Sequence, residues 1–174
     1  MRKKIFAFLL LSALYAGAQE VPDWENPIVV GINKEPYHAT LTLPSQKADC
    51  KEIISLNGKW RFQWSADPGK RPADFYKNDF NTDTWDTITV PGAWQLQGYG
   101  KPIYSNVNYP FQKDAPRVTS EPPAEYYSYG HRNPTGSYVT TFEVTPDMKD
   151  KCLYLHFEGV KSAMYVWVNG ERVG

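Results

Sequence analysis

The sequence predicts an all-β fold, an antiparallel sandwich, and three observations support this prediction. Several short stretches alternate apolar and polar residues with a period of two, turn residues separate them, and no stretch carries a helical repeat. Aromatic residues make up 15% of the 174 residues, with six Trp and twelve Tyr. Such a composition is typical of β structure with rings at the surface, and rings can stack on carbohydrate. The length allows one domain with a hydrophobic core.

The first twenty residues have the pattern of a secretory signal. A basic stretch at 2–4 precedes an apolar run of about a dozen residues, and Ala16, Gly17 and Ala18 form a small-x-small cleavage site before Gln19. The apolar run is too short to cross a membrane comfortably. We therefore expect residues 1–18 to be removed, and the mature protein to be periplasmic or extracellular and free of the membrane.

Residues 19–54 carry several prolines and no sustained periodicity, so we expect an extended arm that lies on another part of the protein. The first strand follows in "SLNGKWRFQW", where polar residues alternate with five others on the opposite face: Leu56, Gly58, Trp60, Phe62 and Trp64. A second short strand, "DTITVPGAW", should end at Pro91 and Gly92.

The polar, proline-rich stretch 113–136 should be an irregular excursion over the surface. Strands are expected again at 137–144, 151–160 and 163–174, and the last of these contains a strong hairpin signal, Asn169-Gly170. Only four residues follow this turn, too few for a full return strand, and the unpaired edge would expose part of the core. We therefore expect residues 55–174 to be one β domain that is incomplete at its C-terminus.

Charge and cysteine content argue against several classes of function. Nineteen basic and nineteen acidic residues balance to a net charge of zero. No basic block stands out, which argues against nucleic acid or an anionic membrane as a partner. Cys50 and Cys152 are far apart in the sequence. An exported protein could pair them, but two separate thiols are favoured.

Recognisable catalytic and metal-binding patterns are missing from the sequence. His38, His131 and His156 lack the spacing of metal ligands. No glycine-rich phosphate loop and no nucleophile elbow is present. Glu121 and Glu125 could form a carboxylate pair, although solvated loop acids are far commoner. From the residues alone, a carbohydrate-binding role is favoured over an enzyme.

The stretch "KPIYSNVNYPF", residues 101–111, combines three aromatic rings with two prolines and two asparagines. Pro102 and Pro110 lack backbone donors, which disfavours a helix or a central strand. Two interpretations are open: a loop pinned by its rings, or a rim that presents the Asn106 amide to a polar ligand.

Five motifs resemble the N-terminal region of the large β-galactosidases of glycoside hydrolase family 2. They cover nearly all of the chain from Asp23 onward and stand in the family's order: "DWENP", "SLNGKWRFQW", "VPGAWQLQGYGKPIYSNVNYPF", "RNPTGSYVTTFEV" and "FEGVKSAMYVWVNGERVG". The run "GYGKPIYSNVNYP" resembles the β-galactosidase branch rather than the β-glucuronidase or β-mannosidase branches.

This resemblance implies a jelly-roll sugar-binding domain, followed in complete family members by immunoglobulin-like domains, a TIM barrel and further β-domains. It implies retaining hydrolysis of terminal non-reducing β-D-galactosides, in carbohydrate catabolism, by two glutamates of the barrel. No segment here matches the motifs around those glutamates, so the chain alone is expected to be inactive. Magnesium and sodium are implied for the complete enzyme. No residue here matches their ligands, and this chain is expected to bind no cofactor.

The resemblance also assigns a role to the loop at 101–111. Asn106 matches the family's galactose-contacting asparagine, and Val107 stands beside it. Four other aromatic residues are interpreted as core or loop-anchoring: Trp60, Trp64, Trp94 and Tyr104. The expected partners are a β-galactoside or galactose and the remainder of the enzyme, including its barrel and other subunits. Two alternatives stay open: a free-standing carbohydrate-binding module, and an assembly piece that docks on another chain.

Overall fold

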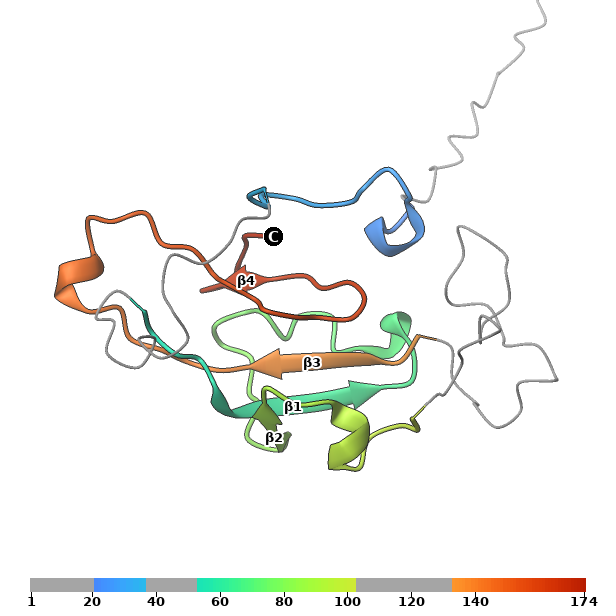
Figure 1. Cartoon of the computed structure of the whole chain (residues 1–174). Coiled ribbons are helices and arrows are strands. Elements are labelled where there is room, and N and C mark those ends of the chain that lie inside the picture. Colours follow the sequence, from blue (N-terminus) through green and yellow to red (C-terminus); the bar gives the residue numbers. More distant parts are fainter. Residues whose placement is uncertain (1–20, 37–52, 103–132) are drawn as a thin grey trace, which may run out of the picture.

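The computed structural model describes residues 21–36, 53–102 and 133–174 (Figure 1). These ranges contain strands and short 3-10 helices and no α-helix. The strands are β1 (Gly58–Ser65), β2 (Asp86–Val90), β3 (Thr135–Val139), β4 (Trp167–Val168) and β5 (Glu171–Arg172). All strand pairs are antiparallel. The all-β antiparallel prediction is confirmed, and the jelly-roll arrangement stays a prediction.

The strand β1 is the centre of a three-stranded sheet with the order β2-β1-β3. Trp60 faces Ile88 on β2, and Phe62 faces Tyr138 on β3. Residues that face each other in an antiparallel pair project to the same side of the sheet. The predicted alternation of β1 therefore gathers its rings on one face, where Phe62 is 0% and Ile88 1% exposed.

A second group of rings joins this sheet to the C-terminal hairpin. The segment between β1 and β2 supplies Phe75, Tyr76 and the buried Trp85. The ring of Phe75 lies 5.9 Å from Trp85 and 5.6 Å from Trp167 on β4. Tyr76 stacks on Trp167 at 5.2 Å. The apolar interior therefore continues from the sheet towards the hairpin.

The hairpin of β4 and β5 forms where the Asn-Gly signal predicts it. Asn169 has φ 51° and Gly170 has φ 89°, the two positive values that a tight hairpin turn requires. The side-chain amide of Asn78 donates a hydrogen bond to the Asn169 carbonyl at 3.1 Å, which fixes the turn against the segment between β1 and β2.

Residues 21–36, the described part of the predicted arm, lie along this hairpin (Figure 1). It begins with a 3-10 turn, η1 (Asp23–Glu25), which the sequence did not predict. Arg172 and Asp23 form an ion pair at 2.7 Å. Further along, the Asn33 amide donates to the Val173 carbonyl at 2.8 Å.

Two strand predictions are wrong. The strand expected at 137–144 ends at Val139, and 151–160 forms no strand although its residues alternate. Phe142 is 40% exposed, Leu153 55% and Tyr154 71%. Within the described ranges no neighbouring strand pairs with 151–160, and a strand without a hydrogen-bonded neighbour is not a stable element. These apolar side chains remain at the surface.

Candidate functional site

The predicted sugar-contacting residues, Asn106 and Val107, lie outside the residues that the structure describes. The same holds for Tyr104, for the carboxylates Glu121 and Glu125, and for His38, Cys50 and His131. The residues that immediately precede and follow 103–132 are described. Near these boundaries, Trp94, Tyr99 and Gly136 pack against Phe62.

Five rings form what we call the Phe62 cluster: Trp60, Phe62, Trp94, Tyr99 and Tyr138. The Phe62 ring is 4.7 Å from Tyr99, 4.7 Å from Tyr138 and 6.1 Å from Trp94. Trp60 meets Tyr138 edge-on at 6.4 Å. Tilted and edge-on pairs of this kind add stability beyond the area that they bury. Trp60 and Trp94 are both half-buried and pack in this cluster, which agrees with the predicted anchoring role rather than with a place in the fully buried core.

The approach to Pro102 runs through this cluster. The 3-10 turn η4 (Trp94–Gln97) places Trp94 on Phe62, and Gly98 at φ 98° ends the turn. Gly100, at φ 66°, lies over the Trp64 indole, which a Cβ would meet at 3.5 Å. A positive φ at both positions is the conformation that glycine adopts without strain. Two glycines thus bend the chain tightly between the cluster and Pro102.

After residues 103–132, β3 brings the chain back beneath the same rings. A Cβ built on Gly136 would lie 2.6–2.7 Å from atoms of Trp94, Phe62 and Tyr138. Only a glycine allows the three rings to close over this strand. Tyr99, before residue 103, and Gly136, after residue 132, therefore both pack in the Phe62 cluster.

Polar contacts fasten η4 to the edge strand β2. The Gln97 side chain accepts from the Thr89 N–H at 2.8 Å and donates to the Thr89 carbonyl at 3.0 Å, as a neighbouring strand would. The Tyr99 hydroxyl donates to Asp86 at 2.9 Å. Desolvation and this hydrogen bond raise the pKa of Tyr99, and burial raises the pKa of Tyr138, so both phenols stay neutral hydrogen-bonding groups at ordinary pH.

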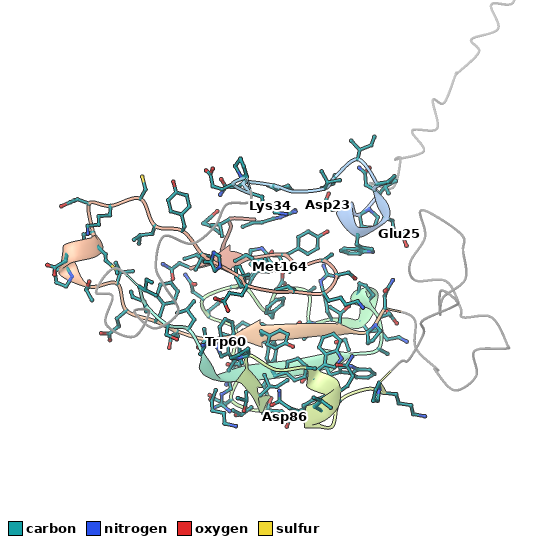
Figure 2. All side chains as sticks on the ribbon, in the orientation of Figure 1. Asp23, Glu25, Lys34, Trp60, Asp86 and Met164 are labelled. Atoms are coloured by element: carbon teal, nitrogen blue, oxygen red, sulfur yellow. The ribbon has the colours of Figure 1, made fainter. Side chains whose placement is uncertain are left out.

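A separate pocket of about 280 Å³ lies where the arm meets the hairpin. We call it the arginine pocket, because two guanidinium groups line it together with aromatic and polar residues. Its lining comes from three segments: Val21, Pro22, Asp23, Trp24, Arg71, Tyr165 and Arg172. Figure 2 shows Asp23 at the opposite edge of the molecule from Asp86, so the pocket is remote from the η4 end of the Phe62 cluster. Sequence reasoning missed this pocket.

The described ranges contain no group of three or more His, Cys, Asp or Glu residues that could hold a metal ion. The expectation that this chain binds neither magnesium nor sodium stays a prediction. Cys152 is a free, exposed thiol. Within the same ranges no helix has the length and apolar character needed to cross a membrane.

The fold and the ring-lined sheet agree with a known class of domain. The family model described as "Glycosyl hydrolases family 2, sugar binding domain" matches residues 53–174. The chain therefore belongs to glycosyl hydrolase family 2 and contains that family's sugar-binding domain.

Within the family, the chain is similar to β-galactosidases. It is 40% identical over 169 residues to a β-galactosidase of Priestia megaterium, a match that covers 91% of this chain and 16% of the relative. For a β-galactosidase of Clostridium acetobutylicum the identity is 42% over 159 residues, covering 87% and 17%. A β-galactosidase large subunit of Lactobacillus acidophilus is 40% identical over 126 residues, covering 69% and 20%. The chain thus spans a small part of each relative's length.

Proposed function

We propose that this chain is the N-terminal sugar-binding part of an exported β-galactosidase that hydrolyses terminal non-reducing β-D-galactosides. The observation that carries this proposal is the similarity to β-galactosidases at about 40% identity across most of the chain. In this proposal the catalytic glutamates belong to a barrel outside this chain. Retaining hydrolysis needs two carboxylates about 5 Å apart across the scissile bond, and no segment of this sequence matches the motifs around that pair.

The role that we propose for Asn106 is a direct contact with the galactoside, with Val107 beside it. An amide can donate to one sugar hydroxyl and accept from another without carrying a charge. The Phe62 cluster supports this role because it includes residues on both sides of the stretch 103–132. Tyr99 and Gly136 pack in this cluster on either side of 103–132, and a binding stretch whose flanking residues are held has less freedom to lose when a sugar binds.

The remainder of the β-galactosidase is the partner that we propose for the exposed apolar residues between 142 and 164. Leu153, Tyr154 and Phe157 are all at least 40% exposed, and large contiguous apolar surfaces are typical of interaction sites. The alternating, extended stretch that carries them suits the addition of another strand, because its backbone has hydrogen-bonding groups to offer. A free-standing binding module would leave this surface in water.

The test of the proposed function is Asn106→Ala in the complete enzyme. Loss of the amide removes one or two neutral hydrogen bonds to the sugar, each worth about 0.5–1.5 kcal/mol. We therefore expect kcat/KM for a galactoside to fall between several-fold and about a hundredfold, with an unchanged melting temperature. Asn108→Ala, in the same stretch, is the matched control and should leave the kinetics near those of the parent.

Steady-state kinetics and a thermal melt on the same samples separate this role from a structural one. If Asn106 only stabilises a turn, alanine lowers the melting temperature and leaves kcat/KM nearly unchanged. That result would contradict the proposed contact and would make 103–111 a structural loop.

Export is the other testable part of the proposal. The basic stretch, the apolar run and the Ala16-Gly17-Ala18 site have the order of a secretory signal. N-terminal sequencing of the protein recovered outside the cytoplasm should begin at Gln19. A mature protein that retains Met1 would refute cleavage at this site.

A further inference from the structure

We propose that the arginine pocket binds an acidic saccharide unit, a sugar that carries a carboxylate or a sulfate group. The inference rests on the proposed function in one respect, that the ligand is a sugar. It uses none of the residues proposed for galactoside binding, and it lies on the opposite side of the molecule from Asp86 (Figure 2).

The two guanidinium groups of the pocket are held in place before any ligand arrives. Arg71 donates from Nη1 to the Pro68 carbonyl at 2.7 Å, and its Cζ lies 5.1 Å from the Trp24 ring centroid. Arg172 donates from Nη2 to Asp23 at 2.7 Å, and its Cζ lies 4.5 Å from the Tyr165 ring centroid. Side chains fixed in this way lose little freedom when they bind.

Each guanidinium still has donors to offer. An arginine carries five N–H donors in a planar fork. Among the described residues, the hydrogen bonds to these two side chains involve Nη1 of Arg71 and Nη2 of Arg172. The unused donors match the paired oxygens of a carboxylate or sulfate, which a guanidinium binds with two parallel hydrogen bonds.

The charge of the pocket favours an anion. Two arginines and a single acid, Asp23, line it, so one positive charge is left after the ion pair between Arg172 and Asp23. The whole chain has a net charge of zero, and the excess is therefore local. An oxyanion entering the pocket would balance Arg71, whose only described hydrogen bond is to a neutral carbonyl.

The rest of the lining favours a sugar over a free inorganic ion. Trp24 and Tyr165 meet edge-on at 6.2 Å, and together with Val21 and Pro22 they add a smaller apolar part to a pocket whose lining is mainly polar. The C–H groups of a pyranose ring can pack on this apolar part while its acidic group faces the arginines. The volume of about 280 Å³ is just below the range of roughly 300–1,000 Å³ for drug-sized ligands. It therefore suits one sugar unit.

Isothermal titration calorimetry of the chain, at constant ionic strength, tests the inference with defined probes. The acidic sugars are D-glucuronate and D-galactose 6-sulfate, and the controls are D-galactose, acetate and inorganic sulfate. We expect saturable, roughly millimolar binding of at least one acidic sugar, about tenfold or more tighter than any control. The difference between glucuronate and the sulfated sugar identifies which acidic group is preferred.

Substitutions of Arg71 test whether the acidic sugar binds in the arginine pocket. Arg71→Met should weaken binding of the acidic sugar by about tenfold or more, because a charge-assisted pair of hydrogen bonds is lost. Arg71→Lys keeps the charge, loses the fork, and should weaken binding less. Lys77→Met is the matched control, because Lys77 is an exposed cation paired with Asp74 at 3.1 Å outside the pocket. It should bind as the parent does.

Several results would overturn the inference. If acetate or inorganic sulfate binds as tightly as the acidic sugars, the pocket is a general anion site. If galactose binds as tightly, the pocket does not recognise the acidic group. Full binding by Arg71→Met, with near-ultraviolet circular dichroism like the parent's, would mean that the arginines only fasten the arm. If Arg71→Met does not fold, Arg71→Lys carries the same test. Failure of the Asn106→Ala test would leave these titrations unaffected, so the two proposals can fail separately.

Discussion

Replacing Phe62 by alanine should lower the free energy of unfolding by about 3–5 kcal/mol, the usual cost of removing a buried phenylalanine. Phe62 is 0% exposed and its ring contacts Trp94, Tyr99 and Tyr138. Its removal leaves a cavity at the centre of the Phe62 cluster. Because native domains are stable by only about 5–15 kcal/mol, the variant should unfold at a much lower urea concentration than the parent.

Urea titrations in dilute solution, followed by tryptophan fluorescence, measure this loss. Phe142→Ala is the matched control, since the same side chain is removed from a position that is 40% exposed. It should cost no more than about 1 kcal/mol, as is usual for surface changes. Equal losses for the two variants would show that the Phe62 cluster is not the centre of the core.

The second large effect is expected from a single added methyl group. In Gly136→Ala the new Cβ would meet ring atoms of Trp94, Phe62 and Tyr138 at 2.6–2.7 Å. All three rings belong to one packed cluster, so none can move without displacing another, and overpacking of this kind costs about 1–3 kcal/mol or more. Displacing Trp94 would also disturb η4, which precedes the stretch that contains Asn106.

Gly159→Ala is the corresponding control, because nothing lies within 4 Å of a Cβ at that position and its φ is not positive. The two variants of this chain are compared by thermal melts, and Gly136→Ala is also measured in the complete enzyme by galactoside kinetics. We expect Gly136→Ala to lower both the melting temperature and kcat/KM, and Gly159→Ala to leave the melting temperature of the chain unchanged. An unchanged melt for Gly136→Ala would contradict the close packing described for β3.

Local signals predicted the parts of the fold that depend on local chemistry. The period-two pattern around Phe62 placed the rings of β1 on one face, and Asn169-Gly170 placed the hairpin turn. The same kind of pattern at 151–160 failed. Alternation records which side chains share a face, whereas a strand also needs a neighbour to pair with its backbone, and the described residues supply none there.

The candidate sites were predictable to different degrees. Asn106 followed from the resemblance to β-galactosidases and lies outside the described residues, so its role stays a proposal. The arginine pocket could not be predicted, because it joins Trp24, Arg71 and Tyr165 from three distant segments. None of these residues carries a local signal of a binding site in the sequence. Only the tertiary contact between the arm and the hairpin brings them together.

The ion pair between Asp23 and Arg172 joins residues that are 149 positions apart, and this separation bears on the order in which contacts form during folding. The strand β1 can meet β2 early, whereas the Phe62 cluster needs Tyr138 and the arm needs Arg172. Contacts between such distant residues form slowly because long loops must close first. We therefore expect the contact between β1 and β2 to form before the arm docks, and apolar rings such as Trp24 to be exposed in the partly folded chain.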